Sequence, residues 1–258
     1  MVEFLAPLEA LVAGGVLHRR QPPETEPADD LQGAVPHYVF TGPAGGGEPI
    51  RIGIFATIHG DEPESGLGLI RFLQALGANP GLATNYEIHA YPLCNPGGYA
   101  DGTRHSRSGR DLNREFWRNS PEPEVRFLEV ELRHRRFDGV VNLHCDDTSP
   151  GLYGFLSGHV TGDVLSAGLL APALRAAERF LPRNRAPIID GFAATDGILD
   201  RCYDGVLRAP PALRPAPFDI TFETPQLAPV DLQREAFSAA LLAILAAYRG
   251  FISHAADL

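Results

Sequence analysis

Short apolar runs alternate along this chain with longer segments whose apolar residues recur at helical spacing. Residues 50–58 are apolar and rich in β-branched side chains, which is typical of a strand buried in a parallel sheet. Residues 63–77 follow with the periodicity of an amphipathic helix, and we expect Gly77 to cap its C-terminus. The pattern therefore predicts a strand that leads directly into a helix.

The same alternation continues through the rest of the chain. Further strands are predicted at residues 86–93, 137–145 and 218–224, and further helices at residues 121–136, 163–181 and 230–249. Such an order favours an α/β sheet with helices on both faces. Ligands of such sheets bind beyond the C-terminal ends of the strands, so polar residues at those ends are the candidates for function.

Proline-rich stretches separate some of these elements. Residues 20–33, 43–49 and 208–217 are predicted to be surface loops. The sequence has no internal repeat. We expect a single domain over residues 1–258, divided into an N-terminal extension or loop over 1–35, a core with the candidate site over 50–225 and a C-terminal helix over 229–250.

The charge and composition narrow the class of protein. A hydrophobic content of 44% in 258 residues suits an ordinary globular domain. The formal net charge of −10 argues against nucleic acid or an anionic membrane as a partner. No uninterrupted apolar run reaches the roughly 18 residues of a membrane span. The N-terminus carries Glu3 and Glu9 but no early Lys or Arg, unlike a secretory signal, so we expect a cytoplasmic protein.

The cysteines do not indicate a disulfide framework. Cys94, Cys145 and Cys202 are few, odd in number and widely spaced. They fit reduced, buried thiols better than a disulfide network. The sequence has no C-x-x-C pair, so a structural zinc knuckle is not expected.

Two polar clusters contain candidate metal ligands. His59 and Glu62 follow the strand at 50–58 with the spacing H-x-x-E, and His144 stands where another core strand leaves its sheet. A catalytic zinc takes three such ligands and keeps a position open. Alternatively, the first pair lies on a solvated turn and His144 is a buried, hydrogen-bonded histidine. Cys145 should point to the opposite face and belong to the core.

Two aspartates follow His144 directly. Asp146 and Asp147 either line a site or cap the next segment, and the sequence does not separate these possibilities.

An arginine-rich loop covers residues 100–117. It contains Arg104, Arg107, Arg110 and Arg114 in a chain that is otherwise acidic. Arginine binds carboxylates through paired hydrogen bonds, which favours a substrate-binding loop over a solvated basic one. The surplus arginines, Arg107 and Arg110, suggest that the substrate carries a second negative charge.

Glu223 lies in the apolar strand predicted at 218–224. An acid in such a strand is costly unless it has a partner or a chemical role. A raised pKa there would suit a general base. The alternative is a carboxylate at the strand end that points into solvent.

The order of these motifs resembles the zinc carboxypeptidases and their aspartoacylase and succinylglutamate desuccinylase branch. The resemblance rests on HGDE, then NPGG, then T-R followed by D-L-N-R, then a strand ending in L-H, and finally T-F-E. It spans residues 50–225 and implies a mixed, largely parallel twisted sheet flanked by helices on both faces. It also implies one Zn²⁺ per chain, held by His59, Glu62 and His144.

The resemblance assigns further roles. Glu223 matches the base that activates water, and Asp111 matches the carboxylate that orients the first ligand histidine. Arg104 matches the arginine that polarises the scissile carbonyl. Asn113 and Arg114 match the pair that binds the substrate's terminal carboxylate.

Some positions match the family more loosely or depart from it. Asn95 lies in the motif CNPGG, which the deacylase branch shares. Many members carry an acid where this chain has Asn142. Peptidases often have a tyrosine on a mobile loop, and the corresponding position here is Phe192, with Leu199 near the side-chain pocket.

We therefore expect a zinc-dependent hydrolase that cleaves an amide bond next to a carboxylate-bearing group, in the manner of a metallocarboxypeptidase on small peptides. The first alternative is an N-acyl amino acid deacylase. The second is a metal-binding module without catalytic activity. The predicted partner is a small peptide or N-acyl amino acid, and the sequence leaves the oligomeric state open.

Overall fold

The computed structural model describes residues 1–20, 35–156 and 160–256. These residues form a ten-stranded sheet in the order β1-β2-β4-β3-β5-β10-β6-β9-β8-β7. The strands are β1 His18–Arg19, β2 Tyr38–Thr41, β3 Ile50–Ala56, β4 Tyr86–Tyr91, β5 Gly139–Asp146, β6 Tyr153–Leu156, β7 Ile188–Ile189, β8 Phe192–Thr195, β9 Ile198–Leu199 and β10 Phe218–Pro225. The helices are α1 Val2–Ala13, α2 Pro63–Ala78, α3 Pro96–Asp101, α4 Pro123–Arg135, α5 Val160–Ala177 and α6 Val230–Ala256, with short 3₁₀ turns at η1 Pro80–Ala83 and η2 Leu112–Arg114.

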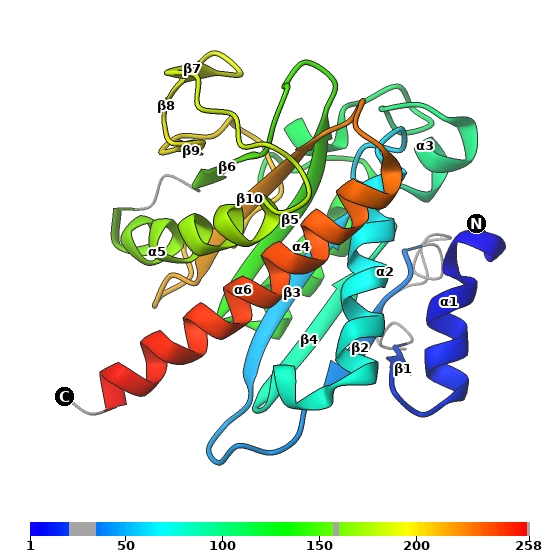
Figure 1. The fold of residues 1–258 in the computed structure, drawn as a ribbon. Helices are drawn as coiled ribbons and strands as arrows, with labels where there is room; N and C mark the ends of the chain where they lie inside the picture. The colour runs from blue at the N-terminus through cyan, green and yellow to red at the C-terminus, as the bar shows by residue number, and fades with distance from the viewer. Residues whose placement is uncertain (21–34, 157–159, 257–258) are drawn as a thin grey trace.

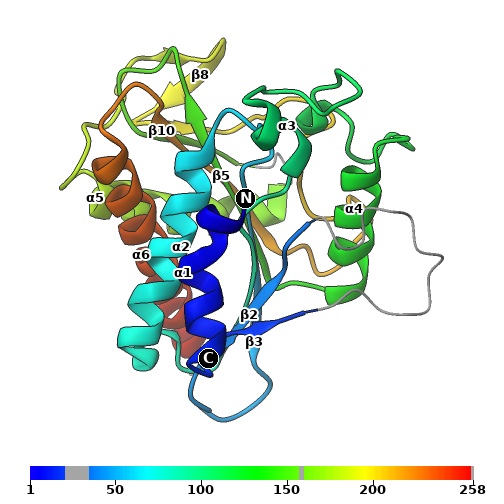
Figure 2. The ribbon, with the colours of Figure 1, turned by 90° about the vertical axis from the view of Figure 1, so that its right-hand side faces the viewer.

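The centre of the sheet is parallel. Strands β4, β3, β5 and β10 are neighbours that run in the same direction, and β2 and β6 flank them antiparallel. Helices α1, α2, α5 and α6 cover one face and α4 covers the other, as the two views show (Figures 1 and 2). The prediction of a mixed, largely parallel α/β sheet with helices on both faces is confirmed.

Alternation along the strands separates two cores. On β5, Val141, Leu143 and Cys145 pack in the core beneath α2, α5 and α6, whereas Val140 packs in the core beneath α4. Because side chains alternate, His144 shares the second face. The prediction that Cys145 belongs to the core is confirmed, since its thiol is buried and lies 3.5 Å from the Thr224 hydroxyl.

The C-terminal end of helix α2 differs from the prediction. Helix α2 continues through Gly77 to Ala78, and Asn79 is the capping residue. The stop comes from Pro80, because the residue before a proline is driven out of the helical region, and Asn79 has φ −141° and ψ 81°.

The N-terminal segment is more ordered than a simple extension. Helix α1 buries Phe4, Leu5 and Leu8 in the main core, and β1 pairs with β2. The Pro7 ring inside α1 weakens the sequence signal for a helix. The acidic, proline-rich loop predicted at 20–33 lies almost entirely outside the described residues.

One described helix, α6, is long and apolar enough by length and composition to cross a membrane, since an 18-residue window within Val230–Ser253 has a mean hydropathy of 1.6. The sequence prediction missed this segment because polar residues such as Arg249 interrupt its apolar residues, although their average hydropathy is high. Its buried residues, among them Phe237 and Leu241, belong to the main core. This packing is that of a core helix.

Candidate metal centre and active-site cavity

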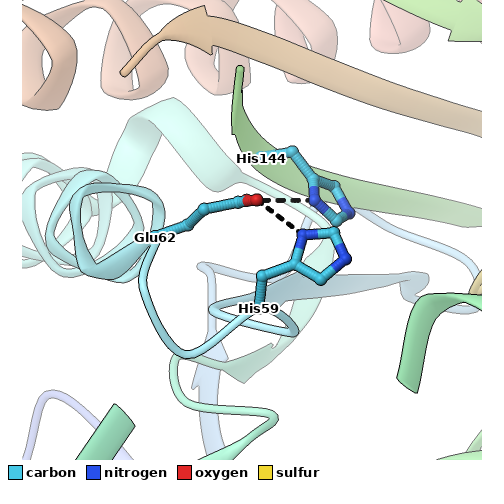
Figure 3. Close-up of side chains that lie close together, drawn as sticks. All are labelled: His59, Glu62 and His144. Atoms are coloured by element: carbon cyan, nitrogen blue, oxygen red, sulfur yellow. Dashed lines mark hydrogen bonds and ion pairs between the residues drawn. The ribbon is translucent and has the colours of Figure 1, made fainter. Parts of the chain in front are cut away.

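The candidate ligands meet at one edge of the sheet because their strands run parallel. His59 lies in the turn after β3, Glu62 immediately precedes α2, and His144 lies near the end of β5. The register between β3 and β5 brings Ala56 beside Leu143, so both strands deliver their ends to the same place. Figure 3 shows Glu62 pointing from the start of α2 toward both histidine rings.

The turn between β3 and α2 has an unusual backbone. Thr57 has φ 53°, which is rare for a β-branched residue, and two hydrogen bonds hold it there. Its amide donates to the Ser65 hydroxyl at 2.9 Å, and its own hydroxyl donates to the Pro92 carbonyl at 3.1 Å. Gly60 lies so close to α3 that a Cβ atom would come within 2.0 Å of the Gly98 backbone. These constraints fix the direction in which His59 leaves the strand.

The ligand atoms of His59, Glu62 and His144 all lie within 4.8 Å of one another. Oε1 of Glu62 lies 2.5 Å from Nδ1 of His59, and its Oε2 lies 3.1 Å from Nδ1 of His144. The three residues are buried, with 3%, 3% and 4% of their surfaces exposed. Two imidazoles and a carboxylate at such spacing form a donor set that suits Zn²⁺.

The outer contacts of the histidines leave both Nδ1 atoms facing Glu62. Nε2 of His59 lies 3.2 Å from Oδ1 of Asp111, and Nε2 of His144 lies 3.4 Å from the Asn113 amide nitrogen. A metal-binding histidine typically donates its second ring N–H to a carboxylate, as His59 is placed to do to Asp111. The donor set and its surroundings therefore fit a metal ion, which the two Nδ1 atoms and the Glu62 carboxylate would hold.

Electrostatics favour an ionised Glu62. Burial alone would raise the pKa of its carboxyl, but His59 and His144 outweigh burial and hold that pKa well below its usual range. For His59, burial lowers the pKa, and the Glu62 and Asp111 carboxylates raise it by more. For His144 the balance is the reverse, since burial lowers its pKa by more than Glu62 raises it, so the opposite charges in contact are those of Glu62 and His59.

Glu223 stands beside this cluster. It pairs in register with His144 across the parallel β10–β5 ladder, so both side chains lie on the same face. Only 8% of its surface is exposed, and it lines the cavity described below. Burial, followed by the charges of Glu62, Asp146 and Asp190, raises the pKa of Glu223 well above its ordinary value. A buried acid with a raised pKa next to a metal site suits proton transfer.

Arg104 reaches the same cluster. Its Nε donates to Oδ2 of Asp111 at 3.3 Å, and its NH1 donates to Oε1 of Glu62 at 3.3 Å. Asp111 therefore contacts both His59 and Arg104. The Arg104 side chain is 40% exposed and also lines the cavity.

Asn113 and Arg114 both line the cavity but differ in how free they are. The Asn113 side-chain oxygen accepts from the Leu207 amide at 2.8 Å, and its nitrogen faces His144. Asn113 is thus largely used in positioning its neighbours. Arg114 donates to the Asn113 carbonyl at 2.8 Å and lies 4.3 Å from the centre of the Tyr203 ring, with no carboxylate ion-paired to it among the described residues.

A cavity of about 390 Å³ opens over the metal-site residues. Its wall also includes Cys202 and residues that the sequence did not single out: Tyr153, Phe155, Asp190, Tyr203, Val206, Thr221 and Gln226. They come from β6, from β10 and from loops, where no motif marks them. One feature of the sequence could have predicted that Tyr203 belongs to the site. It lies in the segment GILDRCYDG, and the alignment with the family through this segment is the one that placed Phe192 and Leu199 near the substrate.

Asp146 and Asp147, the two aspartates that follow His144, both line the cavity. Asp146 also organises the following turn, because its Oδ1 accepts from the Thr148 amide at 2.7 Å and its Oδ2 accepts from the Tyr153 hydroxyl at 2.8 Å. The two possibilities left open by the sequence therefore both apply to Asp146.

Three residues predicted to bind substrate do not line the cavity: Asn95, Arg110 and Leu199. Asn95 is fully buried, accepts from the Gly98 amide at 2.8 Å and caps α3. Arg110 pairs with Glu115 at 3.3 Å and Glu122 at 3.4 Å. Leu199 packs in a small apolar cluster behind the wall because its side chain on β9 points inward.

The surplus arginines are likewise engaged elsewhere. Arg107 pairs with Asp101 at 3.3 Å, and neither it nor Arg110 reaches the cavity wall. The structure thus removes the basis for a second negative charge on the substrate.

The architecture and the site together define the class of protein. A metallopeptidase candidate from Shewanella denitrificans OS217 superposes with a TM-score of 0.73 at 23% identity, over 94% of this chain and 88% of that one. A metallo-carboxypeptidase from Burkholderia cenocepacia gives 0.72 at 16% identity, over 97% and 68%. A Pseudomonas aeruginosa metallo-carboxypeptidase in complex with (2-guanidinoethylmercapto)succinic acid gives 0.65 at 16% identity, over 93% and 67%. The chain has the metallocarboxypeptidase fold.

The family assignment is narrower. Residues 50–179 match the model of the succinylglutamate desuccinylase/aspartoacylase catalytic domain, and the chain belongs to this family. No curated protein matches the sequence significantly. The predicted resemblance is therefore confirmed at the level of family and fold.

Proposed function

We propose that this protein is a zinc-dependent hydrolase that cleaves an amide bond next to a carboxylate-bearing group, as a metallocarboxypeptidase does on small peptides. The observation that carries the proposal is the convergence of His59, Glu62 and His144 within 4.8 Å, with Glu223 paired beside His144. One Zn²⁺ per chain is the proposed cofactor. When bound, it supplies Lewis acidity, which polarises a carbonyl and makes water a stronger acid.

The protein's own residues account for the remaining steps. Glu223 removes a proton from the attacking water and delivers it to the leaving nitrogen. Arg104 faces the cavity and stabilises negative charge that develops on the carbonyl oxygen, a role worth roughly 3–4 kcal/mol for a single donor. Arg114 binds the substrate carboxylate and thereby holds the amide in place. Asn113 supports this arrangement by bonding to the Leu207 backbone.

Deacylation of N-acyl amino acids is the second candidate. The family match favours it, because the family is named for a desuccinylase and an aspartoacylase. Both reactions hydrolyse an amide and use the same residues. They differ only in the acyl group that the cavity accepts.

The test is a hydrolysis screen on the zinc-loaded protein. Acyl dipeptides with a free C-terminal carboxylate and N-acyl amino acids are supplied in parallel, and the released amine is measured. We expect turnover of at least one class, lost when the metal is removed with a chelator and restored when Zn²⁺ is added back. A protein that binds Zn²⁺ tightly but turns over neither class would be a binding module instead.

A further inference from the structure

One wall of the cavity is a segment without regular structure. Residues 202–208, the wall segment, lie between β9 and β10, and the structure describes all of them outside helices and strands. Cys202, Tyr203 and Val206 line the cavity from this segment. Because no backbone ladder holds the wall segment, its position depends on bonds to side chains and to the neighbouring turn.

The wall segment lies directly against the turn that carries Arg114. The Phe116 amide donates to the Gly205 carbonyl at 3.0 Å, and a Cβ atom on Gly205 would come within 2.2 Å of the Arg114 carbonyl oxygen. The carbon of the Arg114 guanidinium lies 4.3 Å from the centre of the Tyr203 ring. A guanidinium that stacks on a ring by its face keeps the N–H groups on its edge for a carboxylate. The wall segment therefore sets where Arg114 presents its donors.

Two asparagines hold Leu207 of the wall segment from its two sides. The Leu207 amide donates to the side-chain oxygen of Asn113 at 2.8 Å, and the Leu207 carbonyl accepts from Nδ2 of Asn142 at 3.0 Å. Asn142 lies on β5, in register with Phe55 of β3 and Thr221 of β10. The bond from Asn142 thus ties the wall segment to the centre of the sheet.

The other half of the Asn142 amide has no partner. Its nitrogen must face the Leu207 carbonyl, because a carbonyl only accepts hydrogen bonds, and its Oδ1 is buried without a hydrogen-bond partner among the described residues. A buried unpaired acceptor costs at least as much free energy as one neutral hydrogen bond returns. An apolar side chain of similar shape would be buried at lower cost, so stability alone does not account for Asn142.

We propose that Asn142 is a positioning residue, which holds the wall segment, and through Tyr203 the Arg114 guanidinium, at a fixed distance from the metal site. His144 lies two residues further along β5 and on the same face, so one strand carries both a metal ligand and the anchor of the wall segment. The inference rests on the proposed hydrolase function, because a substrate held by its carboxylate at Arg114 must place its amide at the metal.

The variant Asn142→Leu keeps the approximate shape of the side chain and removes the donor. The probe is benzoylglycyl-phenylalanine or N-acetyl-phenylalanine, whichever the zinc-loaded enzyme turns over. We expect KM to rise about tenfold, kcat to stay within about twofold, and zinc content and Tm not to fall. Tyr86→Phe is the matched control, because it removes a buried donor from the Leu245 carbonyl, 2.7 Å away in the helical layer. It should lower Tm and leave KM unchanged.

A double-mutant cycle tests whether Asn142 acts through the wall segment. Tyr203→Leu removes the stacking on Arg114 at a half-buried position and should also raise KM. Because both side chains act by placing Arg114, the double variant should raise KM little beyond the larger single effect. A double variant whose KM rises by the product of the two single effects would overturn the proposal.

Hydrogen exchange at the Leu207 amide tests the same contact without a substrate. The wall segment opens locally, so we expect exchange at least about tenfold faster in Asn142→Leu and an unchanged rate in Tyr86→Phe. Wild-type KM or wild-type exchange in Asn142→Leu overturns the proposal, and so does a variant that does not fold, because Asn142 would then serve stability. If neither probe is turned over, the proposed function fails, and faster exchange in a folded Asn142→Leu still supports the positioning role.

Discussion

Oε2 of Glu62 lies 3.1 Å from Nδ1 of His144, although 82 residues separate them in the sequence. The same oxygen accepts the Cys145 amide at 3.0 Å, so the carboxylate is bonded to both the side chain and the backbone at the end of β5. The start of α2 and the end of β5 are thus joined across the sheet. A metal ion bound by these residues would join a site that the fold has already assembled.

Replacing Glu223 by Gln should preserve the metal site and remove the base. The amide has nearly the same size but cannot accept a proton from water. We expect kcat to fall by roughly 10²–10⁴-fold with zinc content unchanged. Steady-state kinetics and elemental analysis on the same sample measure both. Glu235→Gln is the control, since Glu235 pairs with Arg71 in the helical layer away from the cavity. Turnover at the wild-type rate in Glu223→Gln would show that Glu223 is not the base.

Replacing Arg114 by Ala should weaken substrate binding. Losing a charge-assisted contact to the substrate carboxylate costs roughly 2 kcal/mol or more, so KM should rise at least about tenfold, with a smaller change in kcat. Converting the carboxylate of the substrate to an amide should have a similar effect on the wild type and little further effect on the variant. Arg118→Ala is the control, because Arg118 is exposed and lies 4.0 Å from Asp204. Equal sensitivity of both proteins to the blocked carboxylate would show that Arg114 does not bind it.

The sequence alone was enough to predict the site residues that lie within strands or directly after them. His59, Glu62, His144 and Glu223 each come directly after or within a regular apolar run, and parallel strands bring such positions to one edge. Motif order then distinguished this site from a solvated turn. These residues are local features of the chain, and their convergence follows from the class of sheet.

The sequence was not sufficient where the outcome depends on the paths of loops. Arg107 and Arg110 share the loop of Arg104, yet their side chains turn to Asp101, Glu115 and Glu122 instead of the cavity. A loop has no fixed periodicity, so spacing does not reveal direction. Asp190 and Tyr203, which also line the cavity, come from short strands and turns that carry no distinctive sequence pattern.

A second buried polar network, beneath α4, should make stability depend on pH. His37 is 4% exposed, and its Nε2 lies 3.0 Å from Nδ1 of His89. Its ring stacks on Tyr91 at 4.4 Å, and its Nδ1 lies 3.5 Å from Glu131. Burial first, and then the charges of His89, Arg135 and Arg20, lower the pKa of His37 to about 2.

The lowered pKa of His37 determines the direction in which stability changes with pH. The unfolded chain binds a proton at His37 below pH 6.5 while the folded protein does not, so stability is fully present above that pH and is lost as the pH falls toward 2. The loss is about 1.4 kcal/mol per pH unit. Urea unfolding between pH 6 and 4 measures it, and His37→Gln should reduce the slope by about that amount. His18→Gln, at an exposed position, should leave the slope unchanged; the same slope in His37→Gln as in the wild type would contradict this account.

The central claim is that His59, Glu62 and His144 hold one catalytic Zn²⁺. Its most direct test is the zinc content of the purified protein after dialysis, measured by elemental analysis for the wild type, for His144→Ala and for His105→Ala, which alters an exposed histidine outside the cluster. We predict about one Zn²⁺ per chain in the wild type and in His105→Ala, and almost none in a folded His144→Ala variant. A wild type without bound zinc, or a His144→Ala variant that retains it in full, would contradict the claim.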